Sequence, residues 1–375
     1  MVKKKSVVNP YSVSGEVNYE KLIKEFGVSK IDSKLLDRIQ AITKDLHFML
    51  RRGVFFAHRD LNWILDEYKK GNKFFLYTGR APSGKIHLGH LMPWVFVKWL
   101  QDRFDVELWF HFPDEEKFLF KGDLNFDEVQ KTLKDNMLDV IALGFDPKKT
   151  HFIVDTLHAG VMYKEACKVA KKITFSTIKA SFGFNDQSNI GSIFYTSMQT
   201  VPSFLPSVLK NKQIPCLIPH GIDQDPHFRI ARDVLPKLGH LKPASIQCKF
   251  LPALQGPSSK MSSSAEASAI YTTDDAKTVA NKINKYAFSG GGATLVEHKK
   301  NGGNPEVDVS FQYLKMFFES DDKRLEKIKA MYESGDLSTG ELKKILIDKI
   351  NAFLKEHQKK RKEAENKIND FLYKF

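Results

Sequence analysis

The chain has 375 residues, of which 42% are hydrophobic and 27% charged, a balance that predicts two folded domains of ordinary size and excludes a disordered protein. Its net charge of +13 favours a polyanionic partner, nucleic acid before an acidic membrane, although lysine enrichment for solubility would give the same sign. The three cysteines lack CxxC spacing and no apolar run reaches about 18 residues, so we expect a cytoplasmic protein without a zinc ribbon, a redox pair or a membrane span.

Residues 1–50 are predicted to form an N-terminal extension, with a short β-prone piece at 11–17 and a helix at 19–26. Residues 51–270 are predicted to form an α/β domain, because strand and helix patterns alternate from residue 73 to about 254. The predicted strands are 74–78, 106–112, 151–155, 214–219 and 245–251. They are short and apolar on both faces, which is typical of a parallel sheet covered by helices.

Helix signals continue beyond the sheet. Asn125 with Glu128 predicts a capping box, and Gly144 closes that helix. Strand signals fade after residue 269, and Ser338 with Glu341 predicts another capping box. One apolar helix face then follows, made of Leu342, Ile345, Leu346, Ile350, Phe353 and Leu354. Residues 271–375 are therefore predicted to be mainly helical, and the basic run 359–362 is either a solvated face or an RNA contact.

The first chemical signal is the segment 74–100, which predicts a strand, a loop and a helix that opens at His87-Leu88-Gly89-His90. A helix N-terminus offers backbone amides and a positive dipole end to a phosphate. Gly89 permits close approach of a ligand to the backbone, and His87 and His90 can donate to phosphate or ribose oxygens. Two alternatives are a metal-binding HxxH pair, for which no third ligand lies nearby in sequence, and two ordinary core histidines.

The second signal is Lys260-Met261-Ser262-Ser263-Ser264, in a stretch with the composition of a loop. A lysine on a mobile loop can close over a pyrophosphate leaving group and neutralise its developing charge. A serine-rich linker would be the default interpretation of this stretch alone. With HLGH earlier in the chain, the two stretches predict a site that holds a nucleoside triphosphate at both ends.

Two further polar segments follow predicted strands. Asp223, Gln224 and Asp225 could bind an ammonium group where a strand ends, or they could form a solvated turn and helix N-cap. Residues 112–117, FPDEEK, are a second polar strand end, and the alternative for them is a surface charge cluster.

These stretches resemble class I aminoacyl-tRNA synthetases, because HLGH is similar to the HIGH signature and KMSSS to the KMSKS signature. The closer resemblance is to eukaryotic and archaeal tryptophanyl-tRNA synthetases. It extends over residues 8–358 and is carried by YTGRAPSGKIHLGHLMPWVFVKWLQD, IPHGIDQDPHFRIARD, FLPALQGPSSKMSSS, AFSGGGATLVEHKKNGGNPEVDVSFQYL and LSTGELKK.

The resemblance implies a Rossmann-type catalytic domain followed by a helical anticodon-binding domain, in a homodimer. It implies activation of L-tryptophan with ATP and Mg²⁺, transfer to tryptophan tRNA, and no tightly bound protein metal. The implied ATP-binding residues are Arg80, His87, Gly89, His90, Lys260, Met261, Ser262, Ser263 and Ser264, with His87, His90 and Lys260 catalytic. The implied tryptophan-binding residues are Tyr77, His111, Glu116, Lys117, Gln199 and Gln224.

The chain departs from the family pattern at two places. His111 and Pro113 stand where close relatives carry Gln and Thr, and KMSSS lacks the second lysine of KMSKS. Rival interpretations are a tyrosyl enzyme, a small-molecule nucleotidyltransferase and a non-catalytic RNA-binding relative. Pyrophosphate exchange and tRNA charging distinguish them.

Overall fold

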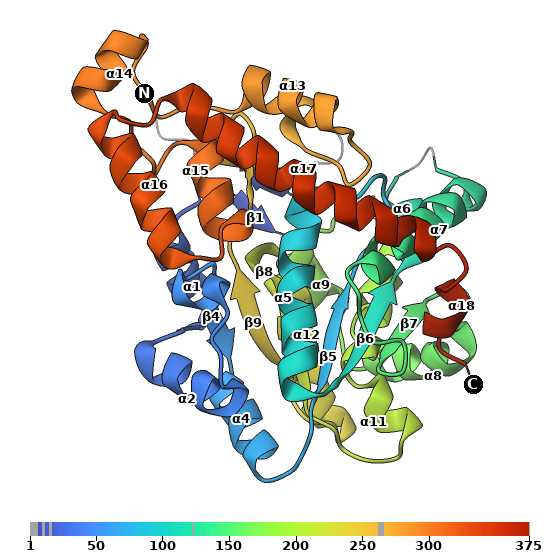
Figure 1. Cartoon of the computed structure of the whole chain (residues 1–375). Helices are drawn as coiled ribbons and strands as arrows, with labels where there is room; N and C mark the ends of the chain where they lie inside the picture. The colour runs from blue at the N-terminus through green and yellow to red at the C-terminus, as the bar shows by residue number, and fades with distance from the viewer. Residues whose placement is uncertain (1–6, 10–11, 15–16, 122–123, 262–265, 375) are drawn as a thin grey trace.

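The computed structural model describes residues 7–9, 12–14, 17–121, 124–261 and 266–374. Its centre is a seven-stranded sheet in the order β3-β4-β9-β8-β5-β6-β7 (Figure 1). The strands in that order are Ser29–Lys30, Phe55–Arg59, Ala244–Cys248, Cys216–Gly221, Phe75–Gly79, Glu107–Phe112 and Thr150–Val154. The strands from β9 to β7 run parallel, whereas β4 is antiparallel to both β9 and β3.

The five predicted strands are thus confirmed, and the expectation of a purely parallel sheet is corrected at one edge. The sequence reasoning missed β4, whose short run ends in His58 and Arg59 and so lacks a fully apolar pattern. Two short antiparallel pairs lie outside this sheet. They are β1 (Val7–Asn9) with β2 (Ser12–Ser14), and β10 (Pro252–Ala253) with β11 (Gly256–Lys260).

Helices cover both faces of the sheet. Up to the last strand of the sheet they are α1 Tyr19–Phe26, α2 Ser33–Thr43, α3 Phe48–Arg51, α4 Leu61–Lys69, α5 Leu88–Phe104, α6 Asp114–Phe120, α7 Phe126–Ala142, α8 Ala159–Ala170, α9 Phe175–Phe182, α10 Ile190–Met198, η1 Val201–Ser203, α11 Leu205–Leu209, η2 Ile222–Gln224, α12 Asp225–Val234 and η3 Leu235–Leu238. After it come η4 Glu266–Ser268, α13 Ala276–Tyr286, α14 Leu295–Asn301, α15 Val309–Tyr313, the π-helical turn η5 Leu314–Phe318, α16 Asp322–Ser334, α17 Thr339–Glu363 and α18 Ile368–Phe371.

The alternation of side chains along β6 separates the two faces. Leu108 and Phe110 belong to one hydrophobic cluster with residues of α5, α7 and the C-terminal helices. Trp109, between them, belongs to a second cluster with residues of α8 to α12. A strand that is apolar on both faces therefore has a helical layer on each, as its sequence pattern predicted.

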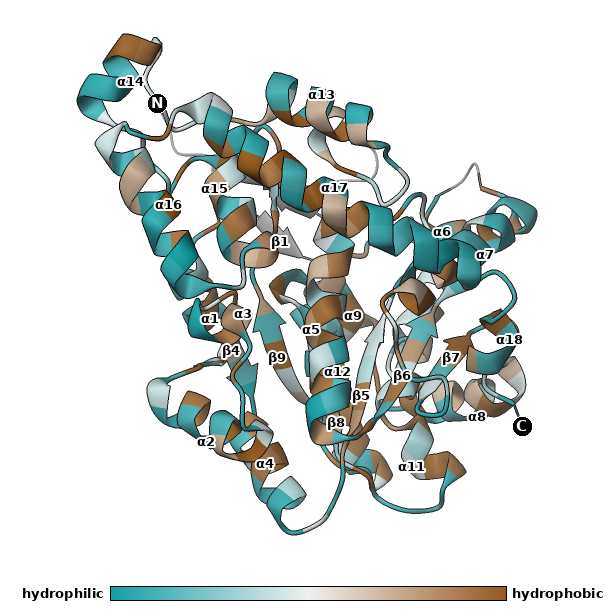
Figure 2. Cartoon of the chain, viewed as in Figure 1, coloured by the Kyte–Doolittle hydropathy of each residue, from teal (hydrophilic) through white to brown (hydrophobic). Residues whose placement is uncertain are grey.

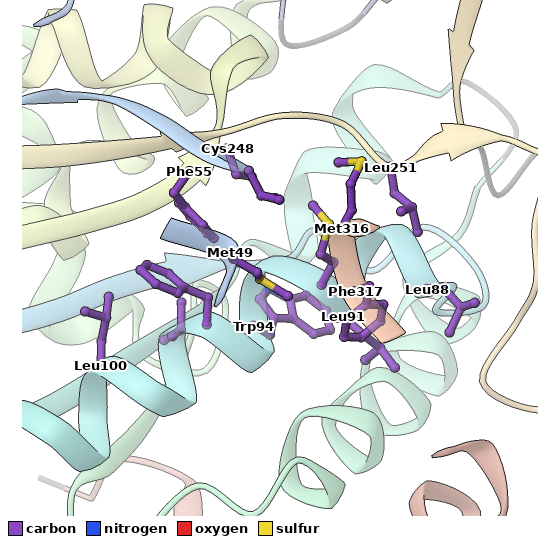
Figure 3. Packing of buried hydrophobic residues seen from close by; sticks show 14 of the residues in the cluster. Met49, Phe55, Leu88, Leu91, Trp94, Leu100, Cys248, Leu251, Met316 and Phe317 are labelled. Carbon is purple, nitrogen blue, oxygen red and sulfur yellow. The ribbon is translucent and has the colours of Figure 1, made fainter. Parts of the chain in front are cut away.

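The larger cluster includes residues from all three predicted ranges of the chain. Figure 3 shows Met49, Trp94 of α5, and Met316 and Phe317 of η5 packed close together. Residues predicted as an N-terminal extension thus contribute to the main core. The division into 1–50, 51–270 and 271–375 stays a prediction.

The predicted capping boxes of α7 and α17 are confirmed. Helix α17 crosses one end of the molecule and contacts α7, α13 and α15 (Figure 1), and Figure 2 shows that its C-terminal end is largely hydrophilic. Arg361 in that end is not simply solvated, because it pairs with Asp135 and Asp139 of α7 and is 15% exposed. Within the part of the chain that the structure describes, no helix is long and apolar enough to cross a membrane.

Candidate active site

A pocket of about 310 Å³ lies at the carboxyl ends of the parallel strands, where ligands bind in open α/β sheets. It brings together most of the residues named from the sequence: Tyr77, Arg80, His87, Gly89, His90, His111, Glu116, Lys117, Gln199, Gln224 and Met261. Ser262, Ser263 and Ser264 lie outside the described residues. Lys260 is the last residue of β11, directly before Met261, and its side chain is also outside the description.

The HLGH stretch begins helix α5 as predicted, with His87 at the N-cap. The His87 and His90 rings stack with centroids 3.6 Å apart, and the His87 backbone amide lies 3.3 Å from His90 Nδ1. A Cβ on Gly89 would lie 3.1 Å from the His87 ring and 3.5 Å from the Met261 Cβ. A side chain at position 89 would therefore crowd the His87 ring, whereas its distance to Met261 would be an ordinary van der Waals contact.

Backbone hydrogen bonds join the HLGH stretch to the segment after KMSSS. The Leu88 amide donates to Ile270 O at 3.1 Å, and the Thr272 amide donates to Ile86 O at 3.0 Å. The HLGH stretch and the segment that follows KMSSS thus share one short antiparallel bridge at His87 and Tyr271. This contact places His87 and Met261, which are remote in sequence, around the same pocket.

A buried lysine anchors the same segment. Lys282 Nζ donates to Ala269 O at 3.1 Å and to Asp274 Oδ2 at 2.7 Å. It also lies 4.5 Å from the centroid of the Tyr271 ring. Lys282 belongs to no motif, and the sequence reasoning did not identify it.

Arg80 lines the pocket and has unused donors. Its guanidinium Nε and Nη2 are buried and have no hydrogen-bond partner among the described residues. Burial lowers the pKa of Arg80 to about 10, so the side chain remains charged at neutral pH. A buried cation with free N–H groups is a strong site for an anion such as phosphate or carboxylate.

One end of the pocket holds a hydrogen-bond network around Tyr77 and Tyr195. The Tyr77 hydroxyl lies 3.2 Å from His111 Nδ1 and 3.2 Å from Gln199 O. The Tyr195 hydroxyl lies 2.6 Å from Gln199 Oε1 and 3.2 Å from Glu116 Oε2. Tyr195 was missed because it lies inside α10, away from any strand end or motif.

The acidic residues of the two polar strand ends lie in different environments, some lining the pocket and some fully buried. Asp223 and Gln224 line the pocket, whereas Asp225 is fully buried and accepts from Arg59 Nη2 at 2.9 Å. In the FPDEEK segment, Asp114 is fully buried and accepts from Thr156 N at 3.0 Å, so it is a structural acid rather than part of a surface cluster. No group of three His, Cys, Asp or Glu side chains that could hold a metal ion occurs in the described ranges, so HxxH lacks a third ligand there.

Comparison with known proteins agrees with this geometry. Residues 69–355 match the family model described as tRNA synthetases class I (W and Y). Two relatives are the tryptophan–tRNA ligase of Sulfolobus acidocaldarius, 52% identical over 98% of this chain and 95% of that protein, and the cytoplasmic tryptophan–tRNA ligase of Schizosaccharomyces pombe, 45% identical over 98% and 96%. The solved structure of tryptophanyl-tRNA synthetase from Giardia lamblia superposes with a TM-score of 0.90 at 40% identity, over 95% of this chain and 96% of that one.

The fold, the joined motifs and the family match define a class I aminoacyl-tRNA synthetase. Since relatives that match nearly the whole chain are tryptophan–tRNA ligases, the chain belongs to the tryptophan–tRNA ligase family.

Proposed function

We propose that this protein activates L-tryptophan with ATP, releases pyrophosphate, and transfers the tryptophanyl group to the 3′ end of tryptophan tRNA. The observation that carries the proposal is the joining of HLGH to the segment after KMSSS beside one pocket, which is also lined by Met261 and, at its other end, by Tyr77, His111 and Gln199. Family membership supplies the choice of amino acid and of tRNA.

At the nucleotide end, the N-terminus of α5 receives ATP phosphates, with His87 and His90 as donors and Gly89 allowing close approach. Arg80 supplies its two unpaired N–H groups to phosphate oxygens. Lys260 acts on the departing pyrophosphate, and Met261, Ser262, Ser263 and Ser264 complete the ATP site. Mg²⁺ enters with the ATP as part of the substrate, bound to phosphate oxygens.

At the amino-acid end, Glu116, Lys117, Gln199 and Gln224 form the polar part of the pocket, and Glu116 can pair with the tryptophan ammonium group. Although burial opposes ionisation, the Lys117 ammonium lowers the pKa of Glu116 and keeps its carboxylate charged. Tyr77 and His111 contact the indole. A buried acceptor for the indole N–H is left unpaired by phenylalanine, which gives strong discrimination without editing.

The first reaction forms a bond between a tryptophan carboxylate oxygen and the α-phosphorus, while the bond from the α-phosphorus to the bridging oxygen breaks. Pyrophosphate leaves with the negative charge that Arg80 and Lys260 stabilise. A ribose hydroxyl at the tRNA 3′ end then attacks the carbonyl carbon, and AMP leaves. Positioning and charge stabilisation supply the catalysis, without a covalent enzyme intermediate.

The macromolecular partners that we propose, a second copy of the chain and tRNA, are argued from exposed apolar and basic side chains. We propose that the protein forms a homodimer and is located in the cytoplasm. The dimer is proposed because three large apolar side chains are exposed near α8 and α10: Leu157, Tyr163 and Ile190, of which Ile190 is 85% exposed. The relative from Schizosaccharomyces pombe is described as cytoplasmic. We propose that residues 271–375 bind the anticodon end of the tRNA. In the basic run 359–362, the lysines are exposed but Arg361 is held by Asp135, so this run is a weak candidate for the contact surface.

The direct test is ATP–pyrophosphate exchange with each proteinogenic amino acid in turn, followed by charging of tryptophan tRNA. Exchange is expected with tryptophan alone. Exchange driven by tyrosine would show that the chain is a tyrosyl enzyme. Exchange without charging would indicate a nucleotidyltransferase that does not act on tRNA.

A further inference from the structure

A buried carboxyl pair lies behind the indole end of the pocket. His111 of β6 is aligned with Ile153 of β7, and Asp155 follows β7 directly. His111 Nε2 lies 2.6 Å from Asp155 Oδ1, and both side chains are 1% exposed. Asp155 was not named in the sequence analysis, although its position at a strand end is where pocket residues gather.

The second member of the pair is Glu115, in the first turn of α6. Burial, together with the nearby Asp155 charge, raises the pKa of Glu115. Glu115 Oε2 and Asp155 Oδ2 are buried, and neither has a hydrogen-bond partner among the described residues. Two adjacent carboxyl groups that are buried in this way cannot both ionise, so they hold one proton between them.

The site of that proton decides the state of His111. Burial raises the pKa of both acids, so the doubly ionised pair is disfavoured. With the proton on Glu115, the Asp155 carboxylate accepts from His111 Nε2 at 2.6 Å. Burial also lowers the pKa of His111 to about 4, so the ring is neutral. A neutral ring that donates from Nε2 has its lone pair at Nδ1.

The Nδ1 side of His111 faces the Tyr77 hydroxyl. This hydroxyl has one hydrogen to donate and two possible acceptors, His111 Nδ1 and Gln199 O, each 3.2 Å away. If the hydroxyl donates to Gln199 O, the lone pair of Nδ1 remains available. If it donates to Nδ1, the hydroxyl oxygen remains available. In both arrangements His111 and Tyr77, which line the pocket, provide at least one acceptor and no spare donor.

We propose that Asp155 is a positioning residue for tryptophan selectivity, because its buried 2.6 Å contact with His111 Nε2 fixes the Nε2–H tautomer of His111 and so reserves an acceptor for the indole N–H. The inference rests on the proposed function, since it takes tryptophan as the ligand. The other acids near His111 have separate partners. Asp114 accepts from Gln130 Nε2 at 2.8 Å, and Glu116 is paired with Lys117.

A double-mutant cycle tests the proposal by measuring kcat and KM for tryptophan in ATP–pyrophosphate exchange. Asp155→Ala is expected to raise the tryptophan KM about five- to a hundred-fold, the effect of leaving a buried polar group unpaired, with kcat changed less than about threefold. His111→Gln supplies an acceptor that has no tautomer to fix. In the His111→Gln background, Asp155→Ala should therefore change the KM less than about twofold.

Equal losses in the two backgrounds would overturn the proposal, since a merely structural Asp155 matters whatever residue stands at 111. If Asp155→Ala does not fold, the cycle is repeated with Asp155→Asn, which keeps the side-chain volume but can also donate a hydrogen bond. An effect on KM that depends on the residue at 111 supports the proposal, and an equal effect in both backgrounds overturns it. Glu115→Gln mimics a protonated acid and should leave the tryptophan KM within about threefold; a larger rise would show that Glu115 acts as a charged group. Glu165→Gln, at a buried acid of α8 paired with Lys168, is the matched control and should leave KM unchanged.

The proposed function and the role of Asp155 are refuted by different results. If the parent enzyme shows no tryptophan-dependent exchange, the proposed function is wrong. If the parent activates tryptophan and the cycle is additive, only the role of Asp155 is wrong.

Discussion

Replacing Arg80 with methionine is expected to slow adenylate formation and, at the same time, to stabilise the fold. The reason is that Arg80 carries a buried charge with two N–H groups that no described residue accepts. Its pKa is lowered by burial, which means that the folded protein opposes the charge. Such a group costs stability in the free enzyme and gains its partners only when an anion binds.

The magnitudes follow from these two unpaired donors. A hydrogen bond to a charged group contributes about 1.5–3 kcal/mol, so losing two such bonds to a transition-state phosphate should lower kcat/KM for ATP by roughly two to four orders of magnitude. Removing an unsatisfied buried group should raise the free energy of unfolding by about 1–3 kcal/mol, seen as an increase in Tm of a few degrees.

The assays are pyrophosphate exchange and thermal unfolding of the ligand-free protein. Arg52→Met is the matched control, because the Arg52 guanidinium is 8% exposed but bonded to Asp322 Oδ1 at 2.7 Å and to Lys315 O at 2.9 Å. The control should lose stability and keep its activation kinetics. If Arg80→Met lowers Tm as Arg52→Met does, or leaves kcat/KM for ATP within about threefold, Arg80 is a structural residue and the reasoning fails.

Four other predictions concern the loop residue Lys260, the pH dependence caused by His47, the dimer and the tRNA anticodon. Lys260→Ala should lower the single-turnover rate of adenylate formation much more than tryptophan affinity, and an unchanged rate would remove its role. Burial lowers the pKa of His47 to about 4, so the folded protein resists a proton that the unfolded chain binds near pH 6.5. Stability should therefore fall as pH drops from 6.5 to 4, and His47→Asn should lose roughly 1–3 kcal/mol less than the parent over this interval in denaturant titrations; equal losses would contradict this. Sedimentation equilibrium should give a dimer at micromolar concentration, and a fully active monomer would refute it. Changed anticodon bases should weaken tRNA charging and leave exchange without tRNA unaffected; charging indifferent to the anticodon would remove the claim.

The parts of the fold that were predictable are those with a local cause. The parallel strands carry continuous apolar runs because both faces are buried, and the capping boxes of α7 and α17 satisfy amides within their own first turns. Strand β4 was missed because its short run ends in His58 and Arg59, and because its pairing with β9 joins segments far apart in the chain. Arg59, at the end of β4, pairs with the fully buried Asp225, a contact that the sequence analysis did not predict.

The pocket was predictable wherever a motif marks it and unpredictable wherever one side chain acts through another. Tyr77 lies within β5, and His87 and Gln224 are the N-caps of α5 and α12; the structure places all three around the pocket. Tyr195 lines the pocket and Lys282 anchors the segment after KMSSS, both from the middle of helices, where their spacing resembles that of any amphipathic helix. Nothing local distinguishes them, because Tyr195 contacts Glu116, which is remote in sequence, and Lys282 contacts the preceding loop at Ala269.

The glycine-rich stretch around α14, which carries part of the family resemblance, shows how a motif can have a structural rather than a chemical cause. A Cβ on Gly302, whose φ is +70°, would lie 1.8 Å from Glu333 O, and one on Gly303 would lie 2.4 Å from the Tyr332 ring. Both glycines allow the end of α14 to pack directly against α16. His298 of the same stretch lies with Nε2 2.9 Å from Leu337 O, just before α17. These residues therefore fix the helical part that precedes α17, and α17 in turn bonds Thr272 O through Gln358 Nε2 at 2.8 Å. Since Thr272 also bonds Ile86 beside the HLGH stretch, the C-terminal helices are connected by a short chain of hydrogen bonds to the nucleotide end of the pocket.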